Sequence, residues 1–172
     1  MVYNFSNTQI QIPSDLSKIF LHRGRQLVRS ADLYKEHQGY EDNPHITVLF
    51  GIHDEEPPLE LVDALETYPK FTVTMGLVSL FKSQETGKNF DVVKADIHSP
   101  DLHVLNGIVR QTCKYSTEFP EYKPHATVAY VRPDRCDYLD GNPAFKGLSF
   151  VADRLLFSSV KGTKREILFA RR

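Results

Sequence analysis

The sequence predicts an α+β fold built from two related halves. Short β-branched or aromatic runs alternate with amphipathic helical segments along the whole chain. The pentapeptide Pro44–Val48 (PHITV) recurs eighty residues later as Pro124–Val128 (PHATV), with four of five positions identical. The order strand, helix, motif strand, helix, long strand also recurs, with variations, in the second half. Two halves that meet at a shared cleft are therefore expected.

The bulk composition is that of an ordinary globular domain. The 172 residues suffice for one well-buried domain or two small lobes with a shared core. No linker or low-complexity stretch interrupts the chain, so a single bilobed domain over residues 1–172 is expected. The net charge of −1 argues against non-specific gripping of duplex nucleic acid, but it is compatible with a small or single-stranded nucleotide ligand.

Cysteine usage and the first residues bear on the compartment. Cys113 and Cys136 form neither a CxxC pair nor a disulfide framework, which favours a reducing environment. The start of the chain, Met1–Asn7, has neither the basic nor the apolar region of a signal peptide, and no run reaches membrane-spanning length. A cytoplasmic protein without membrane attachment is expected.

The first half begins with a strand and a long helix. Thr8–Ile12 alternates polar and apolar residues, as a strand does, and a Pro-Ser-Asp turn follows it. Apolar residues then recur from Leu16 at near-helical spacing, which predicts an amphipathic helix of roughly five turns that ends loosely near Gly39. The first motif strand follows, from His45 to about Ile52.

The middle of the chain predicts a short helix and a hairpin. The turn Asp54–Pro58 precedes a helix that carries apolar residues between Leu59 and Leu65. Phe71–Phe81 reads as a long strand, the polar segment Lys82–Asn89 as a hairpin-like loop, and Phe90–Ile97 as the partner strand.

The second half repeats the helix and motif strand. Ser99-Pro100 is a helix-start signal, and the helix is expected to end near Thr112. The second motif strand is followed by an irregular segment, Arg132–Asn142, rich in Pro, Asp and Gly. Two more strands, Leu148–Val160 and Glu166–Ala170, close the chain.

Each motif offers an imidazole and a hydroxyl side by side. Because side chains alternate faces along a strand, His45 and Thr47 point the same way, as do His125 and Thr127. An old duplication that retained only a structural pattern would preserve apolar positions. It would give no reason to keep a histidine and a threonine on one strand face, so a functional role is favoured.

Two imidazoles suit acid–base chemistry on a phosphodiester. One neutral imidazole can take a proton from the attacking water or hydroxyl, and a protonated one can donate to the leaving oxygen. Two hydroxyls can hydrogen-bond the non-bridging phosphate oxygens. A metal site would need further ligands, of which His53 is the one nearby histidine, and no GxSxG or Cys–His pair points to a nucleophile. No metal and no cofactor are expected.

The paired motifs resemble the two His-x-Thr signatures of the 2H phosphoesterase superfamily, the LigT-like group that includes 2′-5′ RNA ligases and cyclic phosphodiesterases. Ile10–Leu16 resembles the family's opening strand and helix start, and Phe90–Val109 resembles the segment before its second motif. The resemblance implies two α+β lobes related by pseudo-twofold symmetry. Their antiparallel sheets face a central groove, and each lobe supplies one motif. The short spacing between motifs resembles compact bacterial or phage members.

By this resemblance the catalytic set is His45, Thr47, His125 and Thr127. His45 is favoured as the base and His125 as the acid, with the roles exchanged in the reverse reaction.

The resemblance also implies a class of reaction. The expected function is metal-independent hydrolysis of phosphodiester bonds in nucleotides or at RNA ends, such as 2′,3′-cyclic phosphates or 2′-5′ linkages. One alternative is a phage-type enzyme that degrades cyclic di- or oligonucleotide immune signals. A second is a non-catalytic nucleotide- or RNA-binding module, and a third is RNA ligation. The expected partner is a small nucleotide, cyclic oligonucleotide or RNA end, with no obligate protein partner.

Substrate-binding residues are expected close to the motifs. A base needs an aromatic surface for stacking, and a phosphate needs cations. Candidates of these types, each of which could instead be an ordinary surface or core residue, are Tyr40, Phe81, Tyr122, Lys123 and Arg132. Strand alternation from the histidines predicts that Phe50 and Tyr130 point away from the groove.

Overall fold

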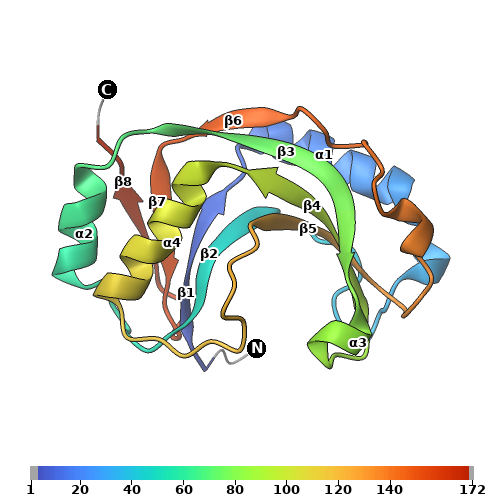
Figure 1. Cartoon of the computed structure of the whole chain (residues 1–172), viewed down its shortest axis with the longest axis horizontal. Coiled ribbons are helices and arrows are strands. Elements are labelled where there is room, and N and C mark those ends of the chain that lie inside the picture. Colours follow the sequence, from blue (N-terminus) through green and yellow to red (C-terminus); the bar gives the residue numbers. More distant parts are fainter. Residues whose placement is uncertain (1–3, 171–172) are drawn as a thin grey trace.

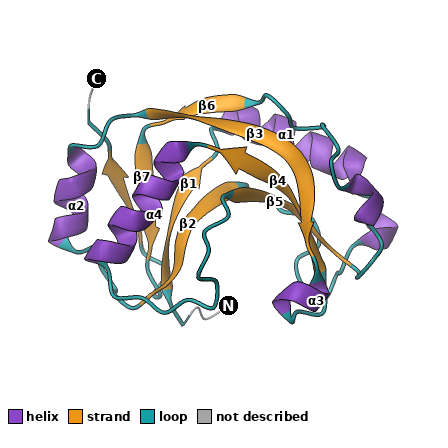
Figure 2. Cartoon of the chain, in the orientation of Figure 1, coloured by secondary structure: helices purple, strands orange, loops and turns teal. Residues whose placement is uncertain are grey.

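The computed structural model describes residues 4–170. In this part of the chain, eight strands form one curved sheet with the order β6-β3-β4-β5-β2-β1-β7-β8, and the helices lie against it (Figures 1 and 2). The strands are β1 (Ser6–Gln11), β2 (His45–Ile52), β3 (Phe71–Phe81), β4 (Asp91–His98), β5 (His125–Val131), β6 (Ser149–Ala152), β7 (Arg154–Ser158) and β8 (Lys164–Leu168). The α-helices are α1 (Ser14–Leu27), α2 (Leu59–Glu66), α3 (Ser83–Thr86) and α4 (Pro100–Thr112), and the two 3-10 helices are Ser30–Asp32 and Asp137–Leu139.

The two motif strands form a seam at the centre of the sheet. β2 and β5 are antiparallel and pair at one residue of each, Ile46 with Ala126. On one side of this seam the sheet continues through β1, β7 and β8, and on the other through β4, β3 and β6. The structure therefore consists of two halves with antiparallel strands, each of which contributes one motif, as expected from the sequence.

The end of the chain differs from its sequence-based description. Leu148–Val160 is not one strand: β6 pairs with β3 at one edge of the sheet, and β7 pairs with β1 on the opposite side of the seam. Asp153 alone separates them. One residue cannot span the width of an open sheet, so the sheet must curl until its two ends approach, as Figure 1 shows.

Helix α1 is shorter than its apolar pattern predicts. It ends at Leu27, and Val28, which is fully buried, adopts an extended conformation. Of the apolar residues expected to continue the helix, Val28 lies in the core and Leu33 packs against it, whereas Ala31 is exposed. No helix within residues 4–170 is long and apolar enough to cross a membrane.

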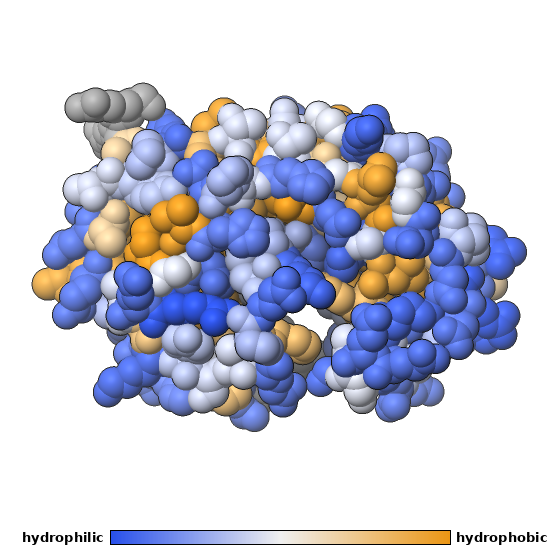
Figure 3. Space-filling model, in the orientation of Figure 1, coloured by the Kyte–Doolittle hydropathy of each residue, from blue (hydrophilic) through white to orange (hydrophobic). Residues whose placement is uncertain are grey.

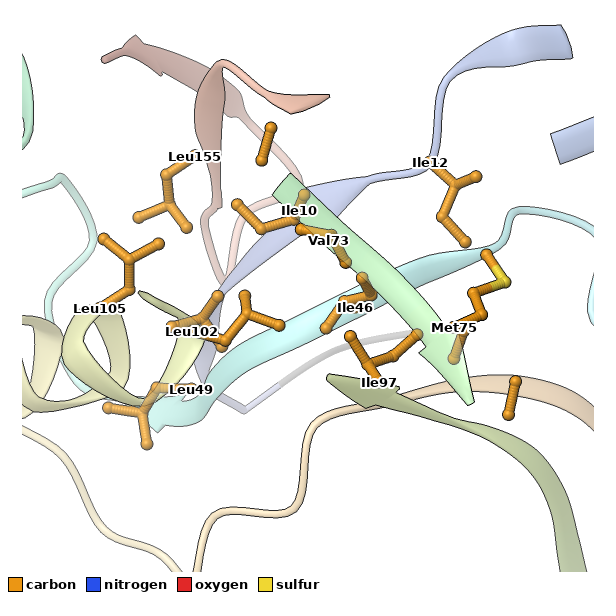
Figure 4. Close-up of a cluster of buried hydrophobic side chains, with 14 of the residues drawn as sticks. Ile10, Ile12, Ile46, Leu49, Val73, Met75, Ile97, Leu102, Leu105 and Leu155 are labelled. Carbon is orange, nitrogen blue, oxygen red and sulfur yellow. The ribbon is translucent and has the colours of Figure 1, made fainter. Parts of the chain in front are cut away.

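The core lies on the face of the sheet that the helices cover. Ile46 and Ala126 are both fully buried there. Helix α4 packs on β2, where Asn106 Nδ2 donates a 2.7 Å hydrogen bond to the Val48 carbonyl, and α1 packs on β5. We call this the helix face. Figure 4 shows that the aliphatic core joins side chains from elements far apart in sequence, among them Ile10, Val73 and Leu155.

Each motif strand carries one extra residue after its motif. Consecutive residues of β1, Thr8 and Gln9, pair with Leu49 and Thr47, so Val48 is a bulge. In the same way, Val93 and Lys94 of β4 pair with Ala129 and Thr127, so Val128 is a bulge. The two halves thus share a backbone irregularity at corresponding positions.

These bulges overturn one expectation from strand alternation. Each shifts the alternation by one residue, so Val48 and Leu49 are both buried, and so are Val128 and Ala129. Phe50 and Tyr130 therefore return to the face that carries the motif histidines, instead of pointing away. Strand pairing confirms the shift. On β1, the partner of Phe50 (Asn7) lies on the same face as the partner of Thr47 (Gln9). On β4, the partner of Tyr130 (Val92) lies on the same face as the partner of Thr127 (Lys94).

Candidate active site

The four motif side chains meet across the seam. Since Ile46 lies opposite Ala126, antiparallel register places His45 opposite Thr127 and Thr47 opposite His125. Directly opposed residues have Cβ atoms about 4.5–5.5 Å apart. The two buried residues between them point into the core, so all four motif side chains, each half-buried, point to the other side. We call that side the histidine face.

The two imidazoles are held in the same way. His45 Nδ1 lies 2.8 Å from the Asn43 carbonyl oxygen, and His125 Nδ1 lies 2.7 Å from the Lys123 carbonyl oxygen. A carbonyl can only accept, so Nδ1 carries a proton in both rings. Nε2 is then the atom that can accept or donate a proton in a reaction. The proline between each carbonyl and its histidine favours the extended backbone that positions this contact.

The surroundings of His125 favour its neutral form. Burial lowers the pKa of the His125 imidazolium, and the positive charges of Lys94 and His45 lower it further. The bond to the Lys123 carbonyl and the charge of Asp96 oppose these effects without overcoming them. The ring of Phe81 meets His125 edge to face, with centroids 4.9 Å apart, and supplies part of this apolar environment.

A buried lysine lies beside the second motif. Lys94 is 6% exposed and pairs with Thr127 on the neighbouring strand, so its side chain lies on the histidine face. Its ammonium is 2.7 Å from Asp96 Oδ1, donates to Ser79 Oγ and lies 4.5 Å from the centroid of the Phe81 ring. Burial alone would raise the pKa of Asp96, but the hydrogen bonds from Lys94 and Ser79 hold it below its usual range.

Sequence reasoning missed Lys94, Asp96 and Ser79. The alternation along Phe90–Ile97 could have placed Lys94 and Asp96 on one face. Nothing in the sequence indicated that this strand pairs with the second motif strand, and so the two residues had no reason to be linked to the histidines.

The corresponding positions in the first half are neutral. Gln9 pairs with Thr47 and Gln11 with His45, as Lys94 pairs with Thr127 and Asp96 with His125 in the other half. Gln9 is buried to a similar degree as Lys94. The histidine face therefore carries two amides beside one motif and an ion pair beside the other.

Three of the expected substrate-binding residues lie close to the motifs. Phe81 contacts His125, as described above. The Tyr122 hydroxyl donates a 2.8 Å hydrogen bond to the Thr47 carbonyl oxygen, and burial raises the pKa of this phenol. Lys123 lends its carbonyl to His125, but its side chain is 61% exposed and only 4.0 Å from Glu121.

The other two lie elsewhere. Tyr40 donates from its hydroxyl to the Val28 carbonyl and lies under the Arg25 guanidinium, 5.1 Å from the ring centroid. It therefore packs against α1 on the helix face. Arg132 donates a 2.7 Å hydrogen bond to the Ala31 carbonyl at the far end of β5, where it lines a surface hollow together with Tyr34. Neither residue is brought together with the four motif side chains.

A separate acidic cluster holds a lysine at its centre. Asp91, Asp134 and Asp137 bring carboxylate oxygens within 4.8 Å of one another. The Lys82 ammonium bonds to all three, at 2.5 Å from Asp91 and 2.9 Å from Asp134. The lysine offsets one of the three negative charges and occupies the space between the carboxylates, and the ion pairs fasten α3 to the segment after β5. In the space-filling view the surface is hollowed between the segment that contains α3 and the loop that leads into β5 (Figure 3).

Comparisons with known proteins identify the fold. No family model and no curated protein matches the sequence. Among solved structures, Escherichia coli LigT complexed with 3′-AMP is 14% identical, with 98% of this chain and 97% of that chain covered and a TM-score of 0.66. TT0787 of Thermus thermophilus is 12% identical (98% and 100% covered, TM-score 0.63), and Kluyveromyces marxianus Usb1 with uridine monophosphate is 14% identical (96% and 98% covered, TM-score 0.60). The chain thus has the LigT-like 2H phosphoesterase fold over nearly its whole length.

Proposed function

We propose that this protein is a 2H-type phosphodiesterase that cleaves phosphodiester bonds of nucleotides or RNA by general acid–base catalysis with two histidines. The observation that carries the proposal is the seam, where two imidazoles, each held through Nδ1 by a backbone carbonyl, and two threonine hydroxyls face each other on one side of the sheet. Residues 1–172 would act as one domain, because each half supplies only half of this set. The two buried free cysteines suit a reducing cytoplasm.

The environment of the two histidines indicates which one would act as the base and which as the acid. The lowered pKa of His125 makes it the neutral partner in the free protein, so we assign it as the base. His125 Nε2 would take the proton of the attacking hydroxyl or water as its oxygen bonds to phosphorus. His45 Nε2 would donate a proton to the leaving oxygen as the P–O bond breaks. This reverses the assignment favoured by the sequence alone.

The remaining groups would stabilise charge on the phosphate. The hydroxyls of Thr47 and Thr127 can donate to the non-bridging oxygens, on which negative charge accumulates in the transition state. Lys94 adds a cation next to Thr127, held by Asp96 and Ser79, in a setting where little water screens it. No step of this scheme requires a metal ion.

Nucleotide ligands of the structural neighbours agree with this substrate class. LigT was solved with 3′-AMP and with ATP, and Usb1 with uridine monophosphate. For this protein a cyclic oligonucleotide signal is a second candidate substrate with the same chemistry. A non-catalytic binder is disfavoured because both motifs are intact and both imidazoles are oriented by a backbone carbonyl.

A turnover assay in the presence of EDTA tests the proposal. The panel contains 2′,3′-cyclic mononucleotides, RNA with a 2′,3′-cyclic end, 2′-5′ oligoadenylate and cyclic di- and trinucleotides, with products resolved by mass. Cleavage that is lost in His45→Ala is the expected result. If the folded wild-type protein cleaves nothing on the panel, the binding module becomes the better description. Cleavage that EDTA abolishes would contradict the metal-free scheme.

A further inference from the structure

Two aromatic clusters flank the motifs, one in each half. The first consists of Phe5, Phe50 and His53, and the second of Phe90, Tyr130 and His37. In both, a histidine stacks on the phenylalanine that directly precedes the strand paired with the motif strand, β1 in the first half and β4 in the second. The ring centroids are 5.5 Å apart in the first cluster and 4.7 Å in the second. In both, the ring from the motif strand meets this phenylalanine edge to face, at 6.0 Å in the first and 5.3 Å in the second.

The clusters occupy equivalent places on the histidine face. Phe50 pairs with Asn7, and Tyr130 pairs with Val92. The phenylalanine of each cluster lies two positions before this partner residue. Asn7 shares a strand face with Gln9, and Val92 with Lys94, so both clusters lie on the side of the sheet that carries the motif side chains.

The two clusters lie on opposite sides of the candidate active site. From the Ile46–Ala126 crossing, the ring-bearing residue of each cluster is four positions along its strand. This is about 10–13 Å once the bulge is allowed for. Because β2 and β5 are antiparallel, these displacements run in opposite directions. A chain bound with its phosphate at the seam would meet one cluster on each side.

The resemblance between the clusters is not a simple relic of duplication. His53 follows β2, whereas His37 precedes the first motif strand in the loop after α1, so the two histidines come from non-corresponding parts of the halves. The nearby equivalent positions of β1 and β4 differ, with Gln9 in the first half and Lys94 in the second. Phe50 is 51% exposed, so much of this ring is accessible to a ligand.

Aromatic rings on this face, exposed at Phe50 and half-buried at Tyr130, suit nucleobases. Bases stack on aromatic side chains regardless of sequence. The second cluster extends through Tyr34, whose ring lies 5.6 Å from Phe90, to the hollow that Lys35 and Arg132 line. That hollow, which the carboxylate of Glu36 also lines, adds apolar surface and two cations to the path of a nucleotide chain on this side.

We propose that each cluster binds a base on one side of the scissile phosphate, and therefore that the substrate is an internal linkage with nucleotides on both sides. This inference rests on the proposed phosphodiesterase function. A 2′,3′-cyclic end, which has nucleotides on one side only, would occupy one cluster and be the poorer substrate.

The test compares one-sided and two-sided substrates in matched variants. Phe50→Leu and Tyr130→Leu keep apolar volume but remove the aromatic face. On an oligonucleotide with a central 2′-5′ linkage, both variants should lower kcat/KM by roughly 5- to 100-fold, since base–aromatic stacking has this strength. On a 2′,3′-cyclic mononucleotide, only one of the two should do so. Tyr138→Leu, an exposed ring outside both clusters, is the control and should match wild type on both substrates.

The proposal would be overturned if both variants lowered kcat/KM equally on the two-sided and the one-sided substrate. It would also be overturned if neither variant changed kcat/KM on either substrate. A binding arm separates this failure from failure of catalysis itself. His45→Ala protein is titrated with a fluorescein-labelled single-stranded tetranucleotide, and anisotropy gives the affinity. Phe50→Leu and Tyr130→Leu, each combined with His45→Ala, should weaken binding by roughly 5- to 100-fold even if no substrate is turned over. Unchanged affinity in both would refute the two-base site independently of any activity.

Discussion

The two halves of the molecule share a backbone design but differ in the chemistry beside each histidine. β1 and β4 have the same pattern of burial over their first six residues, and each pairs with a motif strand that bulges one residue after its threonine. At the equivalent positions, however, Gln9 and Gln11 stand in the first half where Lys94 and Asp96 stand in the second. Duplicated backbone geometry thus presents two imidazoles in the same way, and the side chains next to them make them unequal.

In the proposed mechanism this inequality would have a chemical use. Acid–base catalysis on one phosphodiester needs one imidazole neutral and the other protonated at the same time. Two identical surroundings would give both rings the same preference. A buried ion pair and an aromatic ring next to His125, against amides next to His45, remove that equivalence without disturbing the geometry.

The largest expected effect comes from removing either histidine. His45→Ala and His125→Ala should each lower kcat by roughly 10²–10⁴-fold, the usual contribution of a positioned general acid or base. The pH dependence of the residual kcat/KM should differ between them. His125→Ala should lose the acidic limb of the profile, because that limb reports protonation of the base, and His45→Ala should lose the basic limb.

Circular dichroism spectra of both variants should match wild type. If His125→Ala loses the basic limb of the pH profile and His45→Ala the acidic limb, then His45 is the base and His125 the acid. If either retains wild-type activity, the two-histidine mechanism fails.

The next effect tests the charge asymmetry directly. Lys94→Met should lower kcat/KM by about 10²–10³-fold, comparable to the loss of one preorganised oxyanion donor. Gln9→Met, at the equivalent position of the first half and similarly buried, should cost less than about tenfold. Steady-state kinetics of both proteins, with thermal melting as the folding control, make the comparison. Equal losses would show that Lys94 acts only through packing.

Much of the fold followed from local signals in the sequence. The ranges of β2, β3, β5 and α4 agree with those expected, because each of these elements begins at or within two residues of a Pro. Leu148–Val160 was misread because Asp153, a single residue within an apolar run, gives no local sign that the chain changes partner strand. That choice depends on how far the whole sheet curls.

The candidate site could be predicted only for residues that lie together in a short sequence motif. His45, Thr47, His125 and Thr127 were predicted as the candidate set from the repeated pentapeptide and its resemblance to the paired His-x-Thr motifs. Lys94 reaches the site through strand pairing, which a single sequence does not reveal. The orientation of Tyr130 depends on a bulge at Val128. Because no Gly or Pro marks this bulge in the sequence, strand alternation predicted the wrong face for Tyr130.

A smaller effect would resolve how the ion pair acts on His125. The positive charge of Lys94 lowers the pKa of His125, and the negative charge of Asp96 raises it. Lys94→Met should therefore raise the pKa of His125, and Asp96→Asn should lower it. Titration of the His125 ring protons by NMR measures both shifts without any substrate. Shifts of the same sign would mean that the two side chains influence His125 through structure instead of charge.

The smallest effect appears in stability. Because burial lowers the pKa of His125 in the folded state, the unfolded chain binds a proton to this residue at a higher pH than the folded chain does. As the pH falls below about 6.5, the ordinary pKa of histidine, protonation favours the unfolded state, and stability is lost until the folded pKa is reached. His125→Gln has no such group, so its free energy of unfolding in urea should fall less than that of wild type between pH 8 and pH 5. Parallel declines would show that His125 is solvated well enough to protonate in place, and the argument for this residue as the neutral base would lose its physical ground.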